Sequence, residues 1–252
     1  MTTDLLHIQS AGMEFSDPAS QKAHDLEIIL KRKAHVVGMT EVDSAAFRAQ
    51  VMEACREYNY RALILKSPEG AYSTTPILVH RSIPITSWRF DRVIPAGSDR
   101  FGKWGPRGVT TVRGKWNGSY VSFSWAHWLT RWDTQSRYQA NMRLTDALIY
   151  RVRTDGNKHK LAFWGGDMNW DQDDPTPDHP GLHMRRHGLY TIFDDMKKPD
   201  LATSGRRTIQ LIGRFRPDLR VEPKRLVVHT DAIVPTFTNH SQVSAYYEIE
   251  RP

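Results

Sequence analysis

The chain has 252 residues, of which 39% are hydrophobic and 10% aromatic, and it carries a formal net charge of +7 at pH 7. This length suits one α/β domain over residues 1–252, and the composition is that of a folded globular chain rather than a disordered one. The one cysteine, Cys55, excludes an internal disulfide and a thiolate metal cluster.

Charge and hydropathy indicate where the protein acts and what kind of partner it binds. The start of the chain lacks the basic and apolar stretches of a signal peptide, and no apolar run is long enough to span a bilayer. We therefore expect an intracellular, cytoplasmic monomer with no membrane partner. The excess of 35 Lys and Arg over 28 Asp and Glu indicates an acidic partner, for which nucleic acid is the commonest case.

The first quarter of the chain alternates strands and helices. Residues 5–9 predict a short strand, and apolar residues at helical spacing follow over 19–33. Residues 36–39 predict a buried strand, after which Ser44 can cap a second helix. A strand over 60–65 completes a β-α-β-α-β order, which favours an α/β fold.

The rest of the chain changes character and then returns to longer elements. Over residues 66–126, short extended runs alternate with Gly and Pro turns, as is typical of antiparallel strands. A helix is predicted over 134–153, and late strands over 208–213, 225–229 and 243–249. Two layered sheets with flanking helices are the economical arrangement of these elements.

The most informative segment is a short apolar run, residues 161–164, followed by Gly165, Gly166, Asp167, Met168 and Asn169. We expect the strand to stop on the two glycines, which allow a tight turn. Asp and Asn would then lie at the carboxyl edge of the sheet, where α/β folds place ligands. Together they suit a metal-bound phosphate, whereas a polar strand-to-loop turn without a function is the alternative.

Polar side chains also follow three other predicted strands. Carboxylate, imidazole and amide groups that reach one edge from separate strands are what metal-assisted phosphoryl chemistry requires. The residues that follow the four strands are Glu41, His127, Asp167 with Asn169, and Asn239 with His240.

The order of these residues resembles the endonuclease/exonuclease/phosphatase superfamily, the fold of pancreatic deoxyribonuclease, apurinic endonucleases and inositol polyphosphate 5-phosphatases. Residues 36–42 resemble its strand ending in a metal-binding Glu, and 124–129 its strand ending in a phosphate-contacting His. Residues 166–169 match its Gly-Asp-x-Asn motif, and 238–243 stand in place of its Ser-Asp-His motif. The resemblance spans 5–249 and implies a four-layered α/β sandwich of two packed mixed β-sheets flanked by helices.

Three positions depart from the family pattern. His7 aligns with the Asn of the first strand, Asn239 replaces the Asp before the terminal His, and Gln210 replaces the Asp that orients this His. Asp231 is a conceivable stand-in for one lost carboxylate. Because ligand charge tunes the affinity of a hard-cation site, we expect weakened metal binding, and both a slow enzyme and an inactive one are consistent with these changes.

The resemblance implies a cofactor, Mg²⁺ or Mn²⁺, held by Glu41 with help from His7 and Asn239. It also implies that His240, oriented by Gln210, activates or positions water for in-line attack.

Three further side chains in this scheme act on the nucleophile and the phosphate. Asp167 and Asn169 would orient the nucleophile and the metal-bound phosphate, and His127 would stabilise charge that develops on the phosphorane.

Two residues outside the motifs are candidates for substrate binding. Arg107 starts a segment that resembles a family strand beside the substrate groove, which makes it a candidate phosphate clamp. Trp170 directly follows the Gly-Asp-x-Asn motif and is the tryptophan most suited to stacking on a base, although packing against a sheet is the commoner role.

These observations predict a divalent-metal-dependent phosphodiesterase, with the basic charge favouring a nuclease that hydrolyses DNA or RNA. Two alternatives stay open. One is a non-catalytic nucleic-acid-binding protein that retains the fold, and the other is a phosphatase acting on small phosphate esters or phosphoinositides. The compact form and the substituted motifs fit a phage or bacterial protein.

Overall fold

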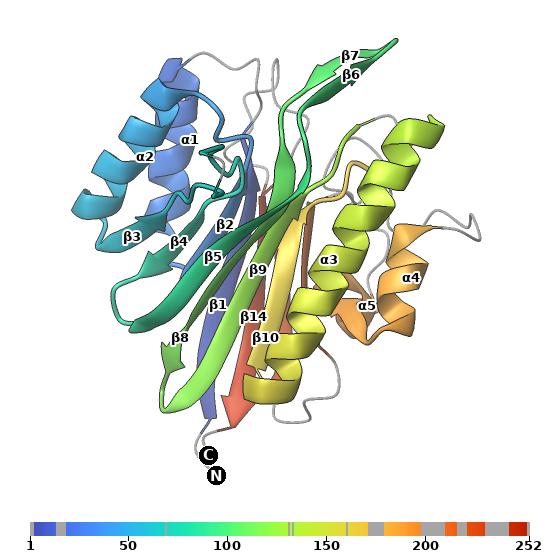
Figure 1. Ribbon diagram of the computed structural model, residues 1–252. Coiled ribbons are helices and arrows are strands. Elements are labelled where there is room, and N and C mark those ends of the chain that lie inside the picture. Colours follow the sequence, from blue (N-terminus) through green and yellow to red (C-terminus); the bar gives the residue numbers. More distant parts are fainter. Residues whose placement is uncertain are drawn as a thin grey trace.

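Two six-stranded sheets pack face to face, and helices cover their outer faces (Figure 1). This is the α/β sandwich with mixed sheets that the sequence predicts. Within the part of the chain that is described, none of the helices has both the length and the apolar character needed to cross a bilayer. The computed structural model describes residues 3–13, 19–68, 70–130, 132, 134–159, 161–170, 179–197, 210–215, 221–229 and 242–250.

The first sheet has the strand order β13-β14-β1-β2-β4-β3. Strands β1 and β2 are parallel, and every other neighbouring pair in this sheet is antiparallel. The carboxyl ends of β1 and β2 therefore lie together at one edge. The strands are β1 (Thr3–Gly12), β2 (Val36–Thr40), β3 (Tyr60–Leu63), β4 (Ile77–His80), β13 (Val221–His229) and β14 (Gln242–Glu250).

The second sheet has the order β11-β12-β10-β9-β8-β5, with β9 and β10 parallel and the other pairs antiparallel. A separate hairpin of β6 (Gly97–Asp99) and β7 (Gly102–Trp104) joins β5 to β8. The strands of the second sheet are β5 (Ile85–Ile94), β8 (Arg107–Trp116), β9 (Ser119–His127), β10 (Leu161–Asp167), β11 (Leu189–Thr191) and β12 (Gln210–Phe215).

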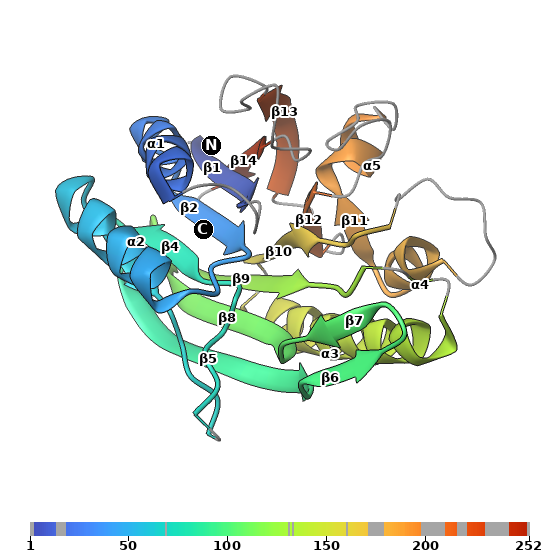
Figure 2. The same cartoon turned by 90° about the horizontal axis from the view of Figure 1, so that it is seen from above.

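Helices α1 (Ala19–Lys31) and α2 (Ala45–Glu57) cover the first sheet, and α3 (Gln135–His159) lies along the second (Figure 2). Short helices α4 (Pro180–Arg186) and α5 (Ile192–Met196) lie near β11 and β12. The Ser44 side chain accepts a 3.0 Å hydrogen bond from the backbone N–H of Phe47, so the predicted cap of α2 is present.

Between the sheets, the fully buried Trp125 of β9 fills the space beneath the carboxyl ends of β2 and β10. A Cβ added to Gly38 of β2 would lie 1.8 Å from Trp125 Cε2, and one added to Gly165 of β10 would lie 2.4 Å from Cζ2. Both glycines therefore provide the room that the indole ring occupies, one from each sheet.

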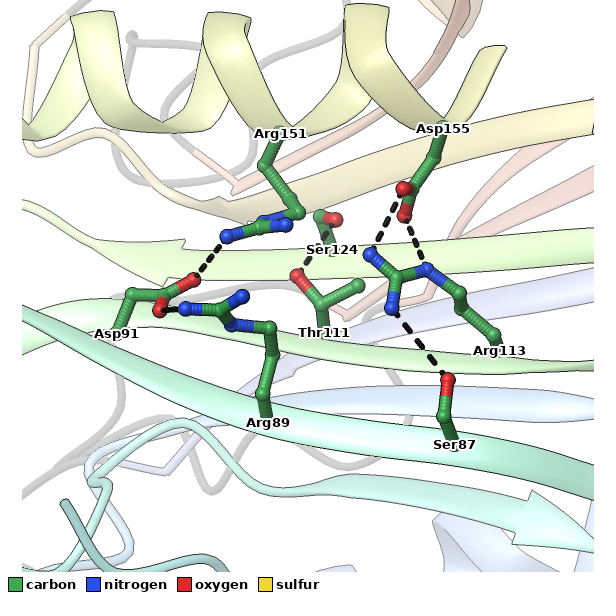
Figure 3. Close-up of polar contacts among 8 residues, drawn as sticks. All are labelled: Ser87, Arg89, Asp91, Thr111, Arg113, Ser124, Arg151 and Asp155. Atoms are coloured by element: carbon green, nitrogen blue, oxygen red, sulfur yellow. Dashed lines mark hydrogen bonds and ion pairs between the residues drawn. The ribbon is translucent and has the colours of Figure 1, made fainter. Parts of the chain in front are cut away.

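Ion pairs join α3 to the outer face of the second sheet (Figure 3). Arg113 of β8 donates two hydrogen bonds, at 2.9 and 2.8 Å, to the carboxylate of Asp155, which is almost fully buried. Arg151 of α3 contacts Asp91 of β5 at 2.7 Å, and Arg89 bonds to the same carboxylate. Bidentate Arg–carboxylate geometry fixes orientation, so β5 and β8 are tied to the helix.

Candidate active site

Three polar residues of the second sheet form a row across neighbouring strands. In the strand register, Asp167 of β10 pairs with His127 of β9 on one side and with Gln210 of β12 on the other. The parallel strands β9 and β10 end at this edge, whereas the antiparallel β12 begins here. All three residues are buried, with exposures of 3% for His127, 1% for Asp167 and 0% for Gln210. The site thus has a preformed polar floor.

Strand β10 continues through both glycines to Asp167, so the expectation that the strand stops on the glycines is wrong. Gly166 has φ +143°, and a Cβ there would lie 1.8 Å from the carbonyl oxygen of Ala126. The glycines therefore allow close strand contact, and the turn begins only after Asp167.

The turn after Asp167 holds its own polar groups in place. The backbone N–H of Asn169 donates to Asp167 Oδ1 at 2.8 Å, and Asn169 has φ 55°, a conformation that Asn tolerates. Asn169 Nδ2 donates to the carbonyl of Trp128 at 2.8 Å and lies 3.1 Å from His127 Nε2. Asp167 and Asn169 thus fix one another and the imidazole.

Glu41 brings a carboxylate to the same place from the first sheet. It directly follows β2, has φ 65°, and its side chain is 25% exposed. Glu41 Oε1 lies 3.8 Å from His127 Nε2, so the two sheets meet at this pair.

The structure does not bring His7 to this group. His7 of β1 is near the start of β2 in register, whereas Gly12 pairs with Thr40 at the end, roughly 16 Å further along the strand. Its ring stacks on Tyr246 at 4.1 Å, and Nε2 lies 3.0 Å from Ser244 Oγ. Burial and neighbouring cationic groups lower the pKa of His7 to about 3. The structure therefore does not place His7 beside Glu41, where the resemblance predicts a metal ligand.

Ser10 is the residue of β1 that reaches the polar row. Its hydroxyl donates to Gln210 Oε1 at 3.0 Å across the two sheets, and the side chain is fully buried. Side chains of a strand alternate between faces, and Leu6 and Ile8 lie in the core between the sheets. The same alternation places Ser10 inward and His7 outward, which is the signal that could have found Ser10.

Two predicted residues, Asn239 and His240, lie outside the described residues, as does Asp231. Among the residues that are described, no group of three or more His, Cys, Asp and Glu side chains is arranged to hold a metal ion. The partly exposed carboxylate of Glu41 and the nearby Asp43 are nevertheless hard oxygen donors, the chemistry that suits Mg²⁺.

A cleft of about 800 Å³ opens beside Glu41 and His127. Because four of the described residues that line it are cationic, the cleft is suited to an anion. The residues that line the cleft include Glu41, Asp43 and His127, the aromatic residues Tyr72, Trp104 and Trp128, and the cations Arg48, Lys103, Arg107 and Arg137. Of these four cations, the sequence analysis predicts only Arg107 as a substrate-binding residue.

Arg107 is the cation most closely associated with the carboxylates. Burial lowers the pKa of its guanidinium, and the negative charges of Glu41, Asp43 and Asp167 oppose that effect. Within the described part of the chain, no group hydrogen-bonds to the buried Arg107 Nε. An arginine remains protonated under these conditions, so Arg107 presents charge and donor capacity to the cleft.

Trp170 does not line the cleft. Its ring packs edge-on against Trp132 at 4.7 Å and against His179 at 5.1 Å. Trp170 therefore packs within the fold, which is the commoner role of a tryptophan, rather than facing the cleft. Tyr72, by contrast, lines the cleft and has the Arg48 guanidinium 4.4 Å and the Lys66 ammonium 4.5 Å from its ring centre.

No protein-family model and no curated protein matches the sequence. Solved structures do match. A D. rerio TDP2 complexed with a single-strand DNA product is 14% identical, with 96% of this chain and 98% of that chain covered and a TM-score of 0.69. The human Nocturnin catalytic domain with a bound sulfate anion is 13% identical, with 98% and 97% covered and a TM-score of 0.70.

An endonuclease/exonuclease/phosphatase family protein from Bacteroides thetaiotaomicron is 14% identical to this chain, with 99% of this chain and all of that one covered and a TM-score of 0.70. At such identities the likeness concerns the fold. It extends over nearly the whole chain, as the sequence resemblance predicts. The chain therefore has the fold of the endonuclease/exonuclease/phosphatase superfamily.

Proposed function

We propose that this chain is a divalent-metal-dependent phosphodiesterase that acts as a nuclease on DNA or RNA. The observation that carries the proposal is the convergence of Glu41 from one sheet with His127 from the other in the lining of a cationic cleft, with Asp167 beside His127 in the strand register. The shared fold with TDP2 and Nocturnin structures supports it.

The proposed cation site uses oxygen donors at the end of β2. Glu41, with Asn239 as a second ligand, would hold Mg²⁺ or Mn²⁺, which when bound polarises a phosphoryl oxygen. An amide oxygen in place of a carboxylate gives a weaker site, so we expect a metal requirement in the millimolar rather than the micromolar range.

The chain's own residues would bind and orient the phosphodiester. Arg107 would offer guanidinium N–H groups to a non-bridging oxygen, and His127 would stabilise the negative charge that develops on the oxygens of the phosphorane. Asn169 positions His127 through the 3.1 Å contact between its Nδ2 and His127 Nε2, and Asp167 positions Asn169 by accepting its backbone N–H. Together they place the reacting group before chemistry begins.

Water activation is assigned to His240, with Gln210 as its positioning partner. Gln210 accepts a hydrogen bond from Ser10, which fixes the amide plane at the edge of the site. A neutral amide can orient an imidazole but cannot stabilise an imidazolium by charge. We therefore expect a turnover well below that of an enzyme with a carboxylate here.

Nicking of supercoiled plasmid in Mg²⁺ or Mn²⁺ tests the proposal, with Asp167→Asn as the site variant. The control is Glu53→Gln, which removes an exposed charge on α2 from a residue that does not line the cleft. Metal-dependent nicking that is retained in Glu53→Gln and lost in Asp167→Asn supports the nuclease. Equal background in wild type and Asp167→Asn rejects DNA cleavage, and a labelled RNA is then tested in the same way.

A non-catalytic nucleic-acid-binding protein is the second candidate. The amide residues Gln210 and Asn239, at positions where the family resemblance implies carboxylates, favour it. Tight binding of an oligonucleotide without cleavage in any divalent metal would assign this role. Release of inorganic phosphate from small esters, with plasmid left intact, would instead assign the phosphatase alternative.

A further inference from the structure

The β6–β7 hairpin forms one wall of the cleft and has no role in the chemistry proposed above. It projects beyond the end of the sandwich at which β9 and β10 terminate (Figure 1). Lys103 and Trp104 of this hairpin line the cleft, whereas Arg100 and Phe101 form its tip. Phe101 is 40% exposed, so part of its ring is accessible to a ligand at the end of the hairpin.

The hairpin is braced by its own side chains. The Trp104 ring covers Gly97 on the opposite strand, where a Cβ would lie 2.6 Å from Trp104 Cζ2. Trp104 Nε1 donates to the carbonyl of Pro95 at 3.2 Å, and the N–H of Phe101 donates to Asp99 Oδ1 at 2.8 Å. The tip residues therefore extend from a fixed base.

Arg137 ties this hairpin to the first turn of α3. Its guanidinium donates to both oxygens of Asp99, at 2.7 and 2.8 Å, and Nη1 donates to the carbonyl of Thr130 at 3.2 Å. The side chain is 6% exposed and lies 5.2 Å from the Trp104 ring and 5.9 Å from that of Phe101. Because its nitrogens already have these partners, Arg137 is suited to hold the hairpin rather than to bind an anion.

We propose that the β6–β7 hairpin is a binding arm for single-stranded nucleic acid outside the cleft, and that Arg137 is the residue that positions it. The proposal rests on the proposed function. Lys103 and Arg100 supply charge for backbone phosphates, and the ring of Phe101 supplies a face for an unpaired base. The Arg100 guanidinium lies 4.7 Å from that ring and extends the stacking surface.

If the hairpin is a binding arm, KM should depend on the length of the strand in a way that the cleft alone does not explain. A substrate that fills only the cleft gains nothing from Phe101, whereas a longer strand does. Loss of the arm should therefore raise KM for a long strand, leave kcat unchanged, and leave a dinucleotide unaffected. A substrate of paired bases offers no free base face at the tip, so a blunt duplex should depend less on Phe101 than a single strand does.

The first experiment measures binding of a fluorescent dT20 strand by anisotropy in the Asp167→Asn background, so it gives an answer whether or not the protein cleaves. We expect Phe101→Ser to weaken binding by about tenfold and Phe101→Trp to restore it. The matched control is Tyr150→Ser, which removes a 66% exposed aromatic ring from α3. Unchanged dT20 binding in Phe101→Ser, or an equal loss in Tyr150→Ser, overturns the proposal.

The second experiment tests the positioning role. Arg137→Gln and Asp99→Asn break the same ion pair from its two sides, so each should weaken dT20 binding and the double variant should be no weaker than the singles. Additive losses overturn the role of the pair. Where the protein cleaves, Phe101→Ser should raise KM for dT20 and leave kcat and dinucleotide cleavage unchanged. An equal loss on both substrates overturns the arm.

Discussion

The two sheets contribute to the candidate site in different ways. The second sheet supplies His127, Asp167 and Gln210 from neighbouring strands in one register row, and all are buried. The first sheet supplies Ser10 from within a strand and Glu41 from a residue beyond one, at φ 65° and with a 25% exposed side chain. The second-sheet residues are thus buried within the fold, whereas the Glu41 carboxylate lies partly exposed at the cleft.

The largest expected effect separates these two contributions. Asp167→Asn removes the charge from a buried acceptor that holds Asn169, and we expect phosphodiesterase activity to fall by about 100-fold or more at every metal concentration. Glu41→Gln weakens a hard-cation donor instead, so part of its lost activity should return as Mg²⁺ or Mn²⁺ is raised. Initial rates across a metal titration check both. Recovery of Asp167→Asn activity at a high metal concentration would contradict this difference between Asp167 and Glu41.

Packing beneath the site gives the next largest effect. Gly38→Ala and Gly165→Ala each place a methyl group against the ring of Trp125, from the first and the second sheet respectively. We expect each to lower the free energy of unfolding by about 3 kcal/mol, because the buried ring has no room to move. The control is Gly105→Ala, where the nearest atom to an added Cβ is 3.7 Å away. Urea unfolding measures all three variants, and equal stabilities would contradict the packing argument.

A third effect concerns the outward face of the first sheet. The pKa of His7 is lowered to about 3 from the ordinary value of 6.5, so folded protein resists protonation that the unfolded chain accepts. Stability linked to His7 is thus present above pH 6.5 and is lost as the pH falls toward 3, at up to about 1.4 kcal/mol per pH unit. Urea unfolding between pH 7.5 and 4.5 should show a shallower decline for His7→Phe. Parallel declines in the two proteins would contradict this assignment.

How well the site residues could be placed from the sequence also differs between the two sheets. Strands β9 and β10 are apolar runs with a polar residue at the end, so the positions of His127 and Asp167 could be predicted from the sequence. Gln210 could be placed because its strand is similarly apolar. His7 was misplaced because matching one residue of a motif ignores which face of the strand a side chain occupies.

Other parts of the site could not be predicted because they depend on contacts between distant segments. Trp170 packs against Trp132 and His179 rather than facing the cleft. Strand β5 has no continuous apolar pattern, because charged and exposed residues interrupt it, and an ion pair with α3 holds it in place. The cations of the cleft other than Arg107 could not be predicted for the same reason. They are Lys103 of the hairpin, Arg48 of α2 and Arg137 of α3, which come together only in the folded chain.

The smallest expected effect returns to the layer between the sheets. Tyr247 of β14 is fully buried, and its hydroxyl has no hydrogen-bond partner within the described residues, so Tyr247→Phe should leave stability unchanged or raise it by up to about 1 kcal/mol. Ser10→Ala should instead cost about 1 to 2 kcal/mol, because it removes the buried hydrogen bond that the Ser10 hydroxyl donates to Gln210 Oε1 at 3.0 Å. Urea unfolding compares the two. A larger loss of stability in Tyr247→Phe than in Ser10→Ala would contradict this order. The buried hydroxyl of Tyr247 would then contribute more to stability than the hydrogen bond between Ser10 and Gln210 at the edge of the site.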